Sequence, residues 1–185
     1  GILLESLKTR LLANAEIESI SFSFVAPTSE NNFSTGYFLT ETGIEELHRV
    51  SIKPVDKAYR ETYGIKLRAG RCFSDAAEQE AHAEVALEKR KLVYIVNEPA
   101  ARRLGFPPDE IIGKKITTGV YDIDSEVVGV VEDFHIASLH EEITPVILMV
   151  LPQYYYTGSI KVKNEDFKET LAHIESTWEQ IFPEY

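Results

Sequence analysis

The chain has 185 residues, of which 44% are hydrophobic and 26% are charged, and this composition excludes an intrinsically disordered protein. Its 30 acidic and 19 basic side chains give a formal net charge of −11 at pH 7. That charge argues against nucleic acid and anionic lipid as partners, because both are recognised by neutralising phosphate. The single cysteine, Cys72, excludes an intramolecular disulfide and a CxxC motif.

The chain is predicted to begin with a helix and a strand. Leu4, Leu7 and Leu11 recur at helical spacing, and Asn14 is expected to close this helix. The β-branched and aromatic residues of 17–24 predict a strand, with a bulge near its middle where the alternation of apolar residues slips.

A run of Ser, Asn, Thr and Pro residues over 27–36 predicts a long loop, which would separate two lobes. Gly64 is placed to end a helix, since a left-handed residue without a Cβ is favoured there. The elements expected in this part are strands at 37–40 and 49–54, a helix at 56–63 and a strand at 65–68.

The middle of the chain contains an insertion followed by a strand and a helix. Residues 75–91 are rich in Ala, Glu, Gln and Lys, which favours an exposed helix or a mobile insertion over core. A strand is expected at 92–96. Asn97 can then cap a helix that has Pro99 in its first turn and ends at Gly105.

The last third of the chain is predicted to hold most of the remaining strands and one long helix. Its apolar residues recur at steps of four and three, so this helix is expected to pack across a sheet. They are Phe167, Leu171, Ile174, Trp178 and Ile181. The other expected elements are a short helical turn at 107–113 and strands at 115–118, 126–131, 145–151 and 159–163.

Four segments that occur in a fixed order resemble the MacB-like periplasmic core domain of ABC transporter permeases (MacB/FtsX-type permease family). The resemblance lies in their combination and extends over most of the chain. The segments are YGIKLRAGRCF (63–73), LVYIVNEPAARRLGF (92–106), IGK (112–114) and VVGVVEDFH (127–135).

The resemblance implies an α+β, two-lobed fold. A porter-like α/β sandwich lobe is expected from 1–29 and 126–185, and an inserted mixed α/β lobe from 30–125, with an exposed insertion at 75–91. The longest apolar run, 146–151, is too short to cross a bilayer. We therefore interpret both ends of the sequence as cut points in a longer membrane protein.

The resemblance also implies a function. The domain is expected at the periplasmic face of the bacterial inner membrane, coupling movement of transmembrane helices to a substrate or partner without catalysis and without a cofactor. The implied partners are the helices of the same permease, a separate or fused ATPase, a second permease copy, or a periplasmic or outer-membrane protein. An extracytoplasmic ligand-binding sensor is the main alternative, which would need a concave apolar pocket with a few polar groups.

One acidic and histidine-containing cluster carries residue types that bind metals or move protons, but its spacing matches no metal motif. We expect Asp133 or His135 to anchor a loop by bonding nearby backbone. A hydrolase that uses the region of His135 and His140 is a third hypothesis. The cluster consists of Asp133, His135, His140, Glu141 and Glu142.

Three consecutive tyrosines, Tyr154, Tyr155 and Tyr156, follow a predicted strand. At least one ring is expected to be exposed, where it can contact a partner; alternatively the rings cover the end of the core. No GxSxG elbow or P-loop is present, so neither a serine hydrolase nor ATP binding by a P-loop is indicated. Asn32 to Ser34 fits the N-glycosylation pattern.

Overall fold

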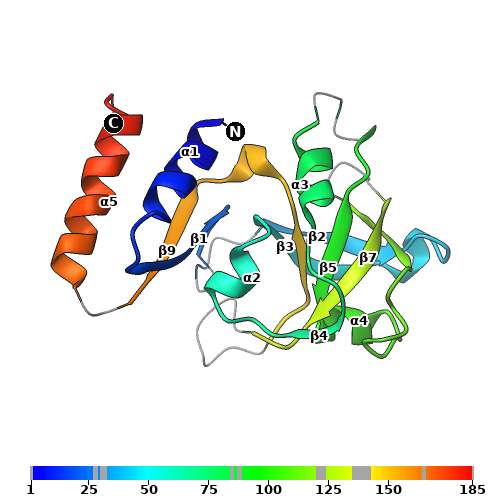
Figure 1. Cartoon of the computed structure of the whole chain (residues 1–185). Coiled ribbons are helices and arrows are strands. Elements are labelled where there is room, and N and C mark those ends of the chain that lie inside the picture. The colour runs from blue at the N-terminus through cyan, green and yellow to red at the C-terminus, as the bar shows by residue number, and fades with distance from the viewer. Residues whose placement is uncertain are drawn as a thin grey trace.

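The computed structural model describes residues 2–26, 29, 33–83, 86, 89–119, 124–134, 143–163 and 166–184. The chain contains both helices and strands, and the fold is α+β, as expected (Figure 1). The elements are α1 (Ile2–Leu11), β1 (Ile17–Ser23), β2 (Phe33–Leu39), η1 (Ile44–Glu46), β3 (His48–Pro54), α2 (Tyr59–Thr62), β4 (Leu67–Gly70), α3 (Asp75–Ala81), β5 (Val93–Asn97), α4 (Glu98–Arg103), β6 (Lys115–Thr118), β7 (Asp124–Val131), β8 (Val146–Met149), η3 (Pro152–Tyr154), β9 (Thr157–Val162) and α5 (Phe167–Ile181).

The strands form a large sheet and a small one. The large sheet has seven strands in the order β4-β7-β5-β8-β3-β2-β6, and β6 also pairs with β7. Because β6 pairs with β7 as well as with β2, the strands from β7 to β6 form a closed ring. Each strand of this ring has a partner on both edges, as in a barrel. The small sheet contains β1 and β9, which run antiparallel.

The large sheet has apolar clusters on both of its faces. On one face, Tyr37 and Tyr94 are fully buried together with Ile147 and Met149. The hydroxyl of Tyr37 donates to the carbonyl of Ala100 in α4 at 3.0 Å, so this helix is tied to that face. On the other face the cluster includes residues of α2, β5, β7 and β8.

The small sheet carries α1 and α5 (Figure 1). Leu7 and Leu11 of α1 are buried against Ile17, Ile20 and Phe22 of β1. A two-stranded sheet is marginal by itself, and the helices supply the apolar cover that stabilises it. We call α1, β1, β9 and α5 the terminal unit.

The range 126–185, which we expected to belong to one lobe, contributes strands to both sheets. Both β7 and β8 fall within or largely within that range, yet both are strands of the large sheet. Residues 127–131 of β7 are valines and one glycine, all of them buried, and all four apolar residues of β8 are buried. A strand of this kind needs cover on each side, which the large sheet provides. The lobe boundaries at 29/30 and 125/126 stay a prediction.

Several local expectations need correction. The expected loop at 27–36 is wrong for its last residues, because Phe33 to Gly36 pair with β3 as part of β2. The shift of register in β1 lies between Ile17 and Ser19, earlier than expected. The segment 107–113 forms turns, and Ile111 anchors it in the core. Within 75–91, α3 is a helix whose last residue, Ala81, is also buried in the core.

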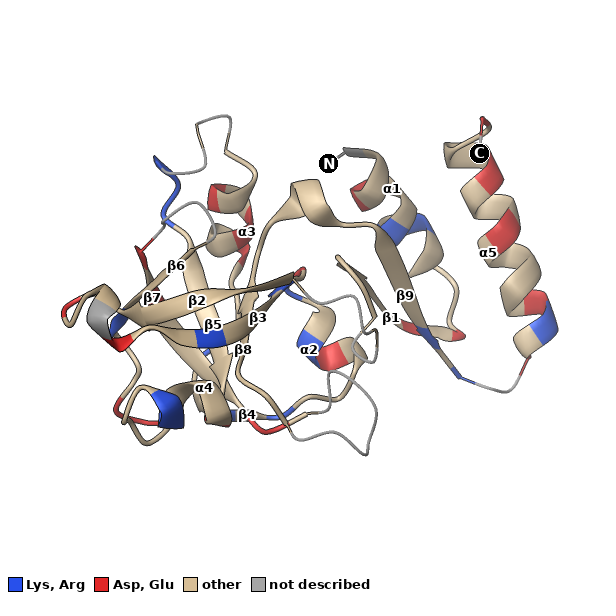
Figure 2. Cartoon of the chain, turned by 180° about the vertical axis from the view of Figure 1, so that it is seen from behind, with Lys and Arg blue, Asp and Glu red and all other residues tan. Residues whose placement is uncertain are grey.

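The long helix α5 is rotated about its axis, so that the face it buries does not coincide with its apolar stripe. Thr170 and Thr177 are 2% and 5% exposed, whereas Phe167, Leu171 and Trp178 are 55%, 42% and 43% exposed. The helix lies beside α1 at the edge of the molecule, with acidic residues along its length (Figure 2). The expected packing of the whole stripe across a sheet is therefore wrong: only part of it, including Ile174 and Ile181, reaches the cluster around β1.

Candidate functional site

The terminal unit is hydrogen-bonded to the large sheet at a place that we call the junction. The junction consists of residues 54–56 at the end of β3, residues 22–24 at the end of β1, and residues 154–156 before β9. Backbone hydrogen bonds run through it in both directions. Phe24 N–H donates to the carbonyl of Pro54 and Asp56 N–H donates to that of Phe22, each at 2.9 Å. Val55 N–H donates to Met149 at the end of β8, also at 2.9 Å. One short segment is thus bonded to both sheets.

The three tyrosines lie at this junction and have different surroundings. Tyr154 packs against the core of the large sheet. Tyr155 packs against the cluster of the terminal unit, and its hydroxyl donates to the carbonyl of Val55 at 2.8 Å. Burial raises the pKa of Tyr155 above its ordinary value. Tyr156 is 70% exposed, and its ring meets that of Phe24 edge-on at 5.7 Å.

Tyr156 separates two hollows in the surface. One, of about 190 Å³, has an almost wholly apolar lining that includes Phe24, Phe33, Pro54 and Tyr154. The other, of about 310 Å³, lies between α1, β9 and α5, with Trp178 among the residues that line it. An exposed aromatic ring between two apolar hollows has the character of a protein-contact surface. The role of the tyrosines as partner contacts stays a prediction.

The carboxylate of Asp56 makes a contact at the junction that sequence reasoning missed. Lys8 Nζ of α1 lies 2.9 Å from Asp56 Oδ2, and the hydroxyl of Ser21 donates to Asp56 Oδ1 at 2.7 Å. Asp56 is 4% exposed. A local sequence pattern cannot predict this pair, because Lys8 and Asp56 are 48 positions apart.

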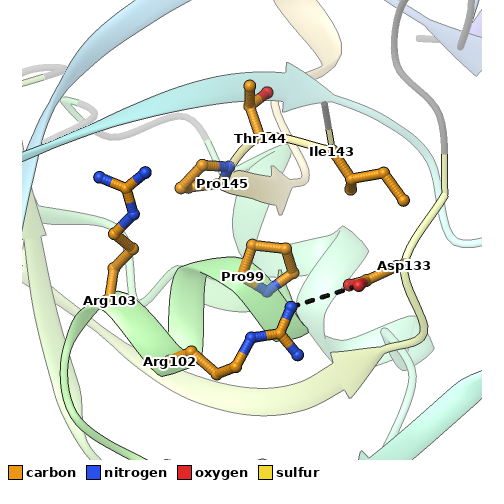
Figure 3. A pocket seen from close by; sticks show the side chains of 7 residues that line it. All are labelled: Pro99, Arg102, Arg103, Asp133, Ile143, Thr144 and Pro145. Carbon is orange, nitrogen blue, oxygen red and sulfur yellow. Dashed lines mark hydrogen bonds and ion pairs between the residues drawn. The ribbon is translucent and has the colours of Figure 1, made fainter. Parts of the chain in front are cut away.

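A third, more open pocket of about 550 Å³ lies beside α4 (Figure 3). Arg102 and Arg103 of this helix line it, opposite Asp133 and the segment 143–145. Arg102 donates to Asp133 at 3.3 Å and to Glu98 at 3.2 Å. Among the described residues, Asp133 bonds the side chain of Arg102. The expected bond from Asp133 or His135 to nearby backbone stays a prediction, because residues 135–142 lie outside that part of the chain.

The rest of the predicted acidic and histidine cluster, His135, His140, Glu141 and Glu142, lies outside the described residues, as does Asn32. Within the described part of the chain, no group of three or more His, Cys, Asp or Glu side chains could hold a metal ion. Over the same ranges, no helix combines the length and the apolar character that crossing a bilayer requires. Cys72 is a partly exposed free thiol.

These features define an α+β domain in which a helix-covered, two-stranded terminal unit is joined to a closed sheet. The family model described as the MacB-like periplasmic core domain matches residues 5–176. The chain belongs to this family, whose members are periplasmic domains of ABC transporter permeases.

Solved structures of two other transporter domains have a similar fold. The periplasmic region of MacB from Actinobacillus actinomycetemcomitans has a TM-score of 0.61 at 15% identity, over 97% of this chain and 72% of that one. The extracellular domain of the ABC-type transporter YknZ from Gram-positive bacteria has a TM-score of 0.63 at 14% identity, over 95% of this chain and 82% of that one. A comparison with curated proteins gives no significant match.

Proposed function

We propose that this domain couples movement of the transmembrane helices of its permease to a substrate or partner outside the membrane, at the periplasmic face of the bacterial inner membrane, without catalysing a reaction. Membership of the periplasmic core domain family supports the location. The observation that carries the coupling is the arrangement of the terminal unit, in which the first and last helices lie side by side on one small sheet (Figure 1).

In this arrangement, a displacement of α1 or α5 acts directly on the small sheet. A force on α1 or α5 reaches the same small sheet, since the helices contact each other and share one apolar cluster with β1. Arg10 of α1 also donates to Gln180 of α5 at 2.5 Å. The junction then links that sheet to β3 and β8, so a shift of the helices moves the large sheet as a packed body.

The partner surface in this proposal is the exposed ring of Tyr156 with the apolar hollow on either side. Tyr154 and Tyr155 support it from the two cores that the junction connects. The partners that suit the proposal are the helices of the same permease, a separate or fused ATPase that drives them, and a second permease copy or a protein of the periplasm or outer membrane.

An insertion experiment in the parent permease tests the coupling. A flexible glycine-serine segment placed directly before α1 separates the domain mechanically from the preceding polypeptide. With the permease and its ATPase reconstituted in nanodiscs, we expect ATP hydrolysis to persist while substrate movement or partner release is lost. The control is the same insertion in the turn at 40–43, at the far end of β2. If substrate movement or partner release is the same in the two insertion variants, the proposal is refuted.

The ligand-binding sensor remains a second candidate because two hollows could hold a small molecule. The pocket beside α4 offers guanidinium groups, and the hollow that Phe24, Phe33 and Tyr154 line offers aromatic rings. A ligand that binds the folded state raises the Tm by mass action. A thermal-shift screen against a metabolite panel therefore separates this function from coupling, for which no small molecule is expected to raise the Tm.

A further inference from the structure

The ion pair between Lys8 and Asp56 differs in burial from the other pairs of the described residues. Its side chains are 15% and 5% exposed. By contrast, Lys57 and Asp75 are 41% and 79% exposed, and Lys161 and Glu18 are 53% and 37% exposed. Exposed pairs are screened by water and contribute little, whereas a buried pair resists separation because either charge left alone is poorly solvated.

Asp56 is well placed to connect the terminal unit to the large sheet. It comes two residues after Pro54, the last residue of β3, and the intervening Val55 bonds to the end of β8. Its own N–H is bonded to Phe22 of β1. Its side chain bonds Ser21 of β1 and Lys8 of α1. Both carboxylate oxygens therefore have donors, and both donors belong to the terminal unit.

An apolar pair of similar volume could fill this space at equal or greater stability, because desolvating two charges is costly. Apolar contacts, however, tolerate sliding, since they have no preferred direction. A charged hydrogen bond has a preferred length and angle. The pair thus supplies a defined position for α1 relative to β3, which packing alone would not fix.

We propose that Lys8 and Asp56 form a latch that sets the orientation of the terminal unit on the large sheet, and through which displacement of α1 reaches β3. Asp56 and Lys8 are positioning residues in this account, which rests on the proposed coupling function. Ser21 holds the second oxygen of Asp56 and fixes the direction in which its carboxylate faces α1.

Distance measurements on the 185-residue chain test the latch directly. Spin labels are attached in a Cys72→Ser background at Glu175→Cys on α5 and Glu126→Cys on β7, two exposed positions in the two parts of the molecule. Pulsed electron paramagnetic resonance then gives the distribution of distances between them. The intact chain is expected to give one narrow distribution.

Replacing Lys8 by Met should widen this distribution by about twofold, because the terminal unit is then free to rock at the junction. Lys8→Arg keeps the charge and should keep the narrow distribution. The control is Lys161→Met, which removes the exposed pair with Glu18 inside the terminal unit and should change nothing. An unchanged width in Lys8→Met would overturn the latch.

A double variant covers the case in which Lys8→Met fails to fold. Lys8→Met with Asp56→Asn leaves no charge buried, and it too should give the wide distribution. Hydrogen exchange of the β5 amides serves as the check that the large sheet is intact. A narrow distribution in the folded double variant would refute the latch as well.

The two proposals fail independently. The distance measurement uses no membrane and no ATPase, so an unchanged distribution refutes the latch and leaves coupling in place. A glycine-serine insertion before α1 without effect refutes coupling, whatever the distance distribution shows.

Discussion

The side chain of Asn97 fixes the beginning of β8, because its amide oxygen accepts a hydrogen bond from Val146 N–H at 2.8 Å. The same oxygen accepts from Ala100 N–H at the start of α4, at 3.2 Å. The amide nitrogen donates to the carbonyl of Thr144 at 2.8 Å. A fully buried residue thus caps a helix and holds a neighbouring strand with all of its polar atoms in use.

Replacing Asn97 by Ala should lower the free energy of unfolding by about 3 kcal/mol, since it removes a helix cap and leaves a buried N–H and a carbonyl without partners. Urea denaturation measures this loss. Asn14→Ala is the matched control: Asn14 accepts one hydrogen bond from Glu16 N–H at a half-buried site, and its loss should cost less than about 1 kcal/mol. Equal losses for the two variants would contradict this role of Asn97.

The neighbouring tyrosines provide a second comparison. Tyr155→Phe removes the hydroxyl that bonds Val55 and should cost about 1–2 kcal/mol, because a junction carbonyl loses its side-chain donor. Tyr156→Phe removes an exposed hydroxyl and should leave the unfolding free energy unchanged. Thermal or urea denaturation of both variants checks the difference, and a greater loss for Tyr156→Phe would show that the surroundings of the two rings are assigned wrongly.

The rotation of α5 predicts which of its faces tolerates charge. Thr177→Lys places an ammonium group at a buried position and should lower the unfolding free energy by about 2 kcal/mol. Leu171→Lys lies on the exposed apolar face and should change it by less than about 0.5 kcal/mol. If Leu171→Lys proves the more damaging substitution in the 185-residue chain, the helix packs through its apolar stripe after all.

Lys53 in β3 predicts a dependence of stability on pH. Burial lowers its pKa from 10.5 to about 8. Between these values the unfolded chain holds a proton that the folded chain has released, so stability rises with pH. The unfolding free energy of the native chain minus that of Lys53→Met should therefore rise by about 3 kcal/mol between pH 8 and 10.5. A difference that stays flat over this range would contradict the lowered pKa.

Structural features that depend only on neighbouring residues in the sequence could be predicted. The cap at Asn97 and the buried valine-rich part of β7 follow from residue type and immediate neighbours, and the structure contains both. The contact between Lys8 and Asp56 depends on how two sheets meet, which neither segment determines by itself. The rotation of α5 was missed for the same reason: its periodicity identifies an apolar face, but the position of α1 decides which face is buried.

The most direct test of coupling is a pair of distances in the reconstituted permease, measured without nucleotide and with ATP bound. The first joins a label on a transmembrane helix of the permease to Glu126→Cys on the large sheet, and the second joins Glu175→Cys on α5 to the same site. The account predicts that the first distance changes on ATP binding while the second stays constant, because the domain moves as one body on its membrane attachment. A first distance that is identical in both states would contradict it.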